Sequence, residues 1–244
     1  MTTVRLYNVK MSLSFATSTA PPRITDDTAR GQFVARVYGH VAIAFGLFLA
    51  LETALFVSGI AEAMGKAIAG KPMMWLLLMG GVMIVSSISS SLATKADPQT
   101  QLKGLALIAL AKAVMFAPFL YYIRLQDDGN SVIATAGFVT LLGIVGLTAV
   151  AYTTRKDLSF LKPITSFLLV LALVAIVGSL IFGFNLGLWF SVAMVGVAGV
   201  RILHQTQEIL RKYPENAYAA AALVLFSSYM LMFWYVLRIF ASRN

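Results

Sequence analysis

The stretch ITSFLLVLALVAIVGSLIFGF, residues 164–184, carries no charged residue over its whole length and decides the fold class. A hydrocarbon core about 30 Å thick takes roughly 20 apolar helical residues, so this stretch is long enough to cross a bilayer. Because the run is apolar on all sides, it does not resemble a surface helix of a soluble domain, which has one polar face. We therefore expect a transmembrane helix.

Six further apolar runs lie on either side of this stretch, bounded by charged residues or prolines. The 244 residues are 59% hydrophobic and 12% charged, which is more apolar surface than one soluble core hides. The sequence predicts an all-α membrane protein, with a flexible cytoplasmic tail at residues 1–30 and a seven-helix transmembrane domain at 31–244. The expected spans are Val37 to Ser58, Met73 to Thr94, Gly104 to Ile123, Ser131 to Tyr152, Ile164 to Phe184, Gly187 to Leu203 and Ala217 to Leu237.

Lysine and arginine residues are unevenly distributed between the two sides of these spans. Twelve fall on the side of the amino terminus and five on the other side, which predicts a cytoplasmic amino terminus. The net charge of +9 is therefore interpreted as a topology signal, and no nucleic-acid partner is expected. The short tails and the lack of an obvious sorting signal favour a bacterial inner membrane.

Residues suited to catalysis or metal binding are scarce. The chain has two histidines, no cysteine and no aspartate in any expected span, so a zinc site within the bilayer is disfavoured. The HExxH, GxSxG, P-loop and GxGxxG motifs are also absent from the sequence. We expect no enzymatic activity and no cofactor, and the lipid bilayer as the main surroundings.

Two ionisable residues lie well inside expected spans, where charge is costly and often functional. Glu52 falls in the outer half of the first span and Lys112 near the middle of the third. Their depths differ by roughly 9 Å, at about 1.5 Å per residue, which a flexible lysine can largely cover. They are candidates for an intramembrane ion pair in a gate or ion path, with a purely structural pair or snorkelling side chains as the alternative.

A second group of polar residues lies at the cytoplasmic end of the sixth span. Arg201, His204, Gln205 and Glu208 are spaced by three, four and seven positions, which places them on one helical face. The stripe is a candidate proton or cation site facing the seventh helix. The alternative is an amphipathic helix end that leaves the membrane.

Four segments, in order along the chain, resemble the Bax inhibitor-1 family. RVYGHVA at residues 36–42 looks like the usual opening of that family. YTTRKDLSFL at 152–161 is similar to its "YTTKxDLSxL" loop, and ILHQTQEIL at 202–210 to its "LYDTQxI" segment. WYVLRIF at 234–240 resembles its "LYLLRIF" ending. The resemblance extends from about residue 30 to the end.

The resemblance implies a bundle of six helices around a central seventh. It also implies a role in stress responses, through a pH-governed leak of calcium or through control of a membrane protease. Calcium-leak members use two aspartates as a shared proton sensor, since paired carboxylates raise one pKa. Here Gln205 and Ser228 occupy those positions. Neither side chain titrates near neutral pH, so the di-aspartyl sensor is replaced.

Two functions therefore compete. The first is a channel-like leak of calcium or another cation, or a stress-regulatory factor, with His204 and Glu208 supplying any pH response. For this function we predict that Gln205 and Ser228 face one another. The observation that would decide for or against conduction is whether these two residues line one continuous wet cavity with Glu52 and Lys112. The alternative is a scaffold that transports nothing and that binds and modulates a membrane protease or another membrane complex.

Overall fold

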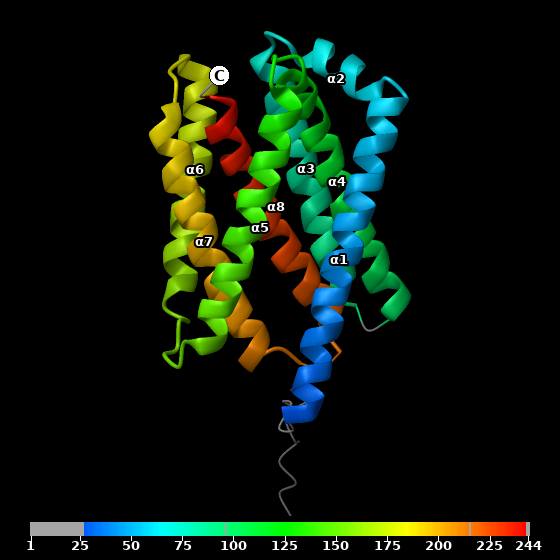
Figure 1. Ribbon diagram of the computed structural model, residues 1–244, viewed down its shortest axis with the longest axis vertical. Coiled ribbons are helices and arrows are strands. Elements are labelled where there is room, and N and C mark those ends of the chain that lie inside the picture. Colours follow the sequence, from blue (N-terminus) through cyan, green and yellow to red (C-terminus); the bar gives the residue numbers. More distant parts are fainter. Residues whose placement is uncertain (1–26, 96, 215, 243–244) are drawn as a thin grey trace, which may run out of the picture.

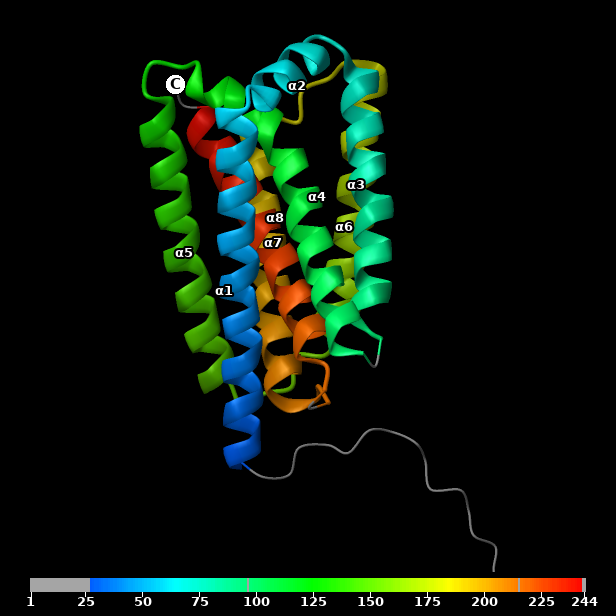
Figure 2. The same ribbon diagram turned by 90° about the vertical axis from the view of Figure 1, so that its right-hand side faces the viewer.

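The computed structural model describes residues 27–95, 97–214 and 216–242, which form eight α-helices and no strand (Figures 1 and 2). Seven of these helices are long and apolar enough to cross a membrane, which confirms the predicted fold class. The expected tail lies outside the described residues as far as residue 26. The helices are α1 (Asp27–Val57), α2 (Ile60–Ile68), α3 (Pro72–Ala93), α4 (Pro98–Arg124), α5 (Gly129–Thr153), α6 (Leu161–Phe182), α7 (Gly187–Arg211) and α8 (Tyr218–Ala241).

The last helix, α8, is central, as the resemblance implied (Figures 1 and 2). It packs against α1, α3, α4, α5 and α7, and 67% of the residues in its most apolar stretch of 18 residues are buried. In contrast, α6 packs mainly on α7, and only 11% of the residues in the corresponding stretch of α6 are buried. We call the end of the bundle where α1 begins the N-terminal end, and the end where α8 finishes the C-terminal end.

Several helices extend beyond the apolar runs because their first or last turns are polar. Helix α4 begins at Pro98, six residues before the predicted start at Gly104. Asp97 caps it by accepting a hydrogen bond from the backbone N–H of Thr100 at 2.9 Å, and proline at the first helical position costs no hydrogen bond. Helix α7 likewise continues to Arg211, past the predicted end at Leu203.

The short helix α2 was not predicted. It lies across the C-terminal end of the bundle between α1 and α3 (Figure 2). Its nine residues are too few to span a bilayer, but Ala61, Gly65 and Ile68 fall on one face and are buried. The Tyr122 hydroxyl on α4 donates a 2.8 Å hydrogen bond to the Gly65 carbonyl, so α2 is fixed to the bundle.

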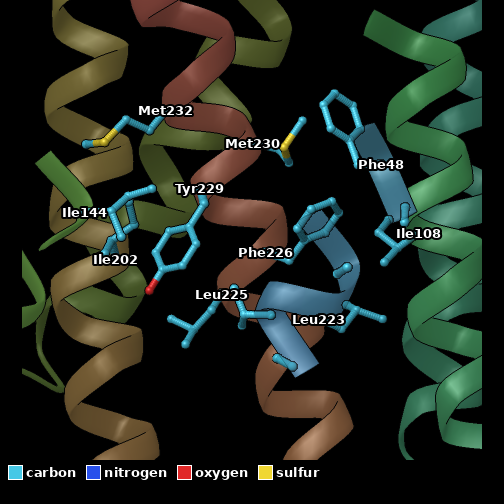
Figure 3. Packing of buried hydrophobic residues seen from close by; sticks show 14 of the residues in the cluster. Phe48, Ile108, Ile144, Ile202, Leu223, Leu225, Phe226, Tyr229, Met230 and Met232 are labelled. Carbon is cyan, nitrogen blue, oxygen red and sulfur yellow. The ribbon is translucent and has the colours of Figure 1, made fainter. Parts of the chain in front are cut away.

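Large side chains fill the space between α8 and its neighbours (Figure 3). Phe226 meets Phe45 of α1 edge to face, with ring centroids 5.2 Å apart. Phe116 of α4 stacks on Phe233 at 5.4 Å, and it also meets Trp234 at 5.1 Å. These contacts fix the rotation of α8 about its own axis, which decides where its polar residues face.

The connection between α6 and α7 is the tight hairpin expected around Asn185-Leu186. Gly183 ends α6 in the left-handed conformation, with φ at 72°, and its backbone N–H bonds the Ser179 carbonyl at 2.9 Å. Gly187 begins α7, also with a positive φ. The predicted division into two spans is therefore correct.

Candidate functional site

The site lies where the last turns of α7 meet the N-terminal half of α8. Gln205 and Ser228 are buried and in direct contact, because the Ser228 hydroxyl donates a 2.6 Å hydrogen bond to Oε1 of Gln205. Arg201 Nε in turn donates to the Ser228 hydroxyl at 3.1 Å. The expectation that Gln205 and Ser228 face one another is confirmed, whereas their role in sensing or conduction stays a prediction.

This contact joins one cation and two neutral groups. The Ser228 hydroxyl serves as acceptor and donor at once, so it bonds the partly buried guanidinium of Arg201 and the buried amide oxygen of Gln205 together. Such an arrangement fixes α7 against α8 but has no carboxyl group that can take up a proton. The replaced di-aspartyl pair is thus a fixed polar contact between two helices.

Glu208, the last residue of the predicted stripe, points away from α8. Glu208 forms an ion pair with Lys162, at the start of α6, with 3.2 Å between Oε1 and Nζ. His204 is buried, at 6% exposure. The four residues of the stripe therefore do not form one cluster, because Arg201 and Gln205 bond toward α8 while Glu208 bonds toward α6.

Gln207 is the residue that sequence reasoning missed. Its buried side chain holds the loop between α5 and α6, since Nε2 donates to the carbonyls of Lys156 at 2.7 Å and Thr154 at 3.3 Å. Its Oε1 accepts the backbone N–H of Leu158 at 2.8 Å. The two segments at 152–161 and 202–210 that carry the family resemblance therefore meet in space.

Charged residues complete this connection. Arg211 Nη2 donates to the Thr154 carbonyl at 2.6 Å, and Lys212 pairs with Asp157 at 3.3 Å. Hydrogen bonds from the hydroxyl and backbone of Ser159, together with Lys212, lower the pKa of the exposed Asp157 carboxyl to about 2. Arg30 of α1 donates to the Tyr213 carbonyl at 2.8 Å and to the carbonyl of Leu210, so it satisfies acceptors at the end of α7.

Four buried hydroxyl groups converge beside the contact between Gln205 and Ser228. The Tyr229 hydroxyl of α8 lies within interaction range of the hydroxyls of Tyr38 (α1), Thr148 (α5) and Thr206 (α7). Within the described residues, none of the four makes a direct hydrogen bond of normal geometry. Hydroxyls gathered in this way are the usual surroundings of an internal water molecule.

The expected ion pair between Glu52 and Lys112 is not formed. Glu52 lines a cavity of about 970 Å³ bounded by α1, α5 and α8, whereas Lys112 lines another of about 760 Å³ bounded by α3, α4, α6 and α8. Neither carboxylate oxygen of Glu52 has a hydrogen-bond partner among the described residues. The two side chains do not pair because they line different cavities. Gln205 and Ser228 line neither cavity, so the four residues do not share one.

A Ser228→Ala variant is expected to destabilise the protein by about 1–3 kcal/mol, because it leaves the buried amide oxygen of Gln205 and the partly buried guanidinium of Arg201 without their shared partner. The loss is measured as the free energy of unfolding in mild detergent. Ser227→Ala is the matched control, since the Ser227 side chain is only partly buried and forms no such bridge. Equal effects of the two substitutions would show that the bridge contributes nothing specific.

Seven apolar helices packed around a buried polar contact define the class, a polytopic helical membrane protein. The chain belongs to the Bax inhibitor-1 family, because the family model described as "Inhibitor of apoptosis-promoting Bax1" matches residues 30–244. It is also similar to an uncharacterized Pseudomonas aeruginosa protein, PA2604, with 36% identity over 114 residues. That match covers 46% of this chain and 51% of the relative, so it spans about half the length of each.

Proposed function

We propose that this protein is a non-enzymatic scaffold of the membrane that binds and modulates a membrane protease or another membrane complex and transports no ion. The single observation that carries the proposal is that the polar interior residues share no cavity. Glu52 and Lys112 line different cavities, and the bonded pair Gln205 and Ser228 lines neither. An ion path needs polar groups that follow one another across the bilayer.

The charges of the interior also disfavour a path for calcium. Lys112 and Arg201 lie close enough to repel each other. No acidic residue pairs with either in the described part of the chain, where the ion pairs involve Lys66, Lys162 and Lys212. Uncompensated positive charge in a narrow interior raises the energy of an entering cation. Loss of the two carboxylates at positions 205 and 228 removes the groups that would offset this charge.

The surface of α6 supports a partner-binding role. This helix packs mainly on α7, and it leaves a stripe of large apolar side chains exposed at Phe167, Leu171, Val174 and Ile181. Helices of a partner pack on such surfaces within the bilayer through van der Waals contact. A cytoplasmic amino terminus is part of this proposal and rests on the distribution of lysine and arginine. A bacterial inner membrane, as expected from the sequence, is also part of the proposal.

A cation leak is the second candidate, and the buried Glu52 favours it. An acidic group inside a cavity within the bilayer is a typical component of proton and ion paths. For a leak, the cavity of Glu52 must join the cavity of Lys112. Met230 lines both cavities and is 1% exposed, so its side chain is part of the wall between them.

Flux measurements distinguish the two functions. Purified protein in liposomes is expected to pass calcium and protons no faster than protein-free liposomes between about pH 5 and 8, a range around the ordinary pKa of histidine. An ionophore serves as the assay control. Flux through the wild-type protein would overturn the scaffold proposal, and faster flux through Met230→Gly would locate the path in the two cavities.

A crosslinking experiment tests the partner directly. A photo-crosslinking residue at Val174 of α6, which is 62% exposed, is expected to capture a membrane protein in native membranes. The same residue at Ile84 of α3, which is 65% exposed, is the matched control and is expected to capture much less of it. Capture of lipid alone at both positions would contradict the scaffold proposal.

A further inference from the structure

The cavity bounded by α1, α5 and α8 has the size and walls of a ligand site. Its volume of about 970 Å³ lies at the upper end of the range for small-molecule pockets, roughly 300–1,000 Å³. Its mouth faces the bilayer, because three of the residues that line it, Leu49, Leu141 and Val145, are 57–60% exposed. A ligand can therefore enter laterally, between α1 and α5, from the hydrocarbon core.

Glu52 is the acidic residue of this cavity. It is 6% exposed, it lines the cavity, and both of its carboxylate oxygens have no hydrogen-bond partner in the described portion of the chain. A buried carboxylate without a partner is costly, and either a bound proton or a cationic partner offsets that cost. Arg124 also lines the cavity but is not paired with Glu52, since its guanidinium lies over the Phe56 ring at 4.8 Å.

The walls fit an organic cation better than a bare metal ion. Five aromatic residues are among those that line the cavity, namely Tyr38, Phe45, Phe48, Tyr229 and Phe233. Aromatic faces attract alkylammonium groups, and the same apolar walls accommodate an alkyl chain. A metal ion would need several oxygen ligands, whereas Glu52 is the single acidic residue that lines this cavity.

We propose that this cavity is a binding site for an amphipathic organic cation, whose ammonium group pairs with Glu52 and whose alkyl chain lies between α1 and α5. The site is independent of the scaffold role, because it involves neither the α6 surface nor the contact between Gln205 and Ser228. The ligand reaches the site from the bilayer. The affinity of the site for this ligand depends on both the charge of Glu52 and the free volume beside α5.

The charge is tested with dodecyltrimethylammonium as the probe and the full chain in nonionic detergent, with bound probe counted by native mass spectrometry. Glu52→Gln is expected to weaken binding on the order of a hundredfold, because it removes the anionic partner of a largely desolvated cation. Glu62→Gln is the matched control, since this exposed carboxylate pairs with Lys66 on α2, and it is expected to leave binding unchanged. Equal binding by wild type and Glu52→Gln, or equal binding of uncharged dodecanol and the cation, would overturn the proposal.

The volume is tested on two glycines of the same helix. Gly137 lines the cavity, and Gly146 does not; a Cβ added at either meets no atom within 4 Å. Gly137→Leu is expected to weaken probe binding about tenfold or more by filling the cavity, while Gly146→Leu is expected to have no effect. This pair decides the question even if Glu52→Gln does not fold, because unchanged binding to Gly137→Leu would place the probe elsewhere.

Discussion

A Gly104→Val variant is expected to lose about 3 kcal/mol of stability or more, because it forces α4 away from α3. A Cβ at Gly104 would lie 2.7 Å from the Ser89 carbonyl oxygen and 2.8 Å from the Ala93 nitrogen. Both atoms belong to the backbone of α3, so no side-chain rotation relieves the clash, and overpacking of a close helix contact costs this much. The measurement is the free energy of unfolding in detergent micelles.

Gly80→Val on α3 is the matched control. A Cβ at Gly80 meets no atom within 4 Å, so the same substitution should change stability by less than about 1 kcal/mol, the order of a helix-propensity difference. The contact near Gly104 also buries Ser89 and Ala93 almost completely. If Gly104→Val and Gly80→Val have the same effect, the close approach of α3 and α4 is not what these small residues provide.

The number and order of the spans could be predicted from the sequence because the bilayer imposes a length on every crossing helix. Helix α2 could not be found by the same rule, because nine residues fall below that length and their amphipathic spacing is short. Helix ends were also missed where polar turns continue an apolar run, as in residues 98–103 of α4 and 204–211 of α7. Local capping by Asp97 sets the first of these limits.

The pairing of polar residues was predictable only where a resemblance supplied the register. The contact between Gln205 and Ser228 could be predicted because two motif positions of the family identify these residues as neighbours. Glu52 and Lys112 were paired from depth alone, and depth says nothing about which way each helix is rotated. Helices α1 and α4 pack directly on each other, but their rotations turn the two side chains into different cavities.

A Gln207→Glu variant is expected to release the loop between α5 and α6 to trypsin. The amide of Gln207 donates to two carbonyls and accepts one N–H, a combination that a carboxylate cannot reproduce. A buried glutamate would place an acceptor against the carbonyls of Thr154 and Lys156, at a cost of about 2 kcal/mol or more. The population of the opened loop then rises by a factor of roughly 30.

Trypsin reports this opening because Arg155 and Lys156 lie in the loop with exposed side chains while their backbone carbonyls are bonded to α7. Cleavage after these residues should be slow in the wild type and at least about tenfold faster in Gln207→Glu, with Gln99→Glu as the control at an exposed glutamine at the same end of the bundle. Gln207→Ala separates the two causes, because alanine removes the bonds without adding repulsion. If alanine opens the loop more than glutamate does, the packing of the Gln207 side chain holds the loop in place. The hydrogen-bond pattern of Gln207 would then not be the reason that the two family segments meet.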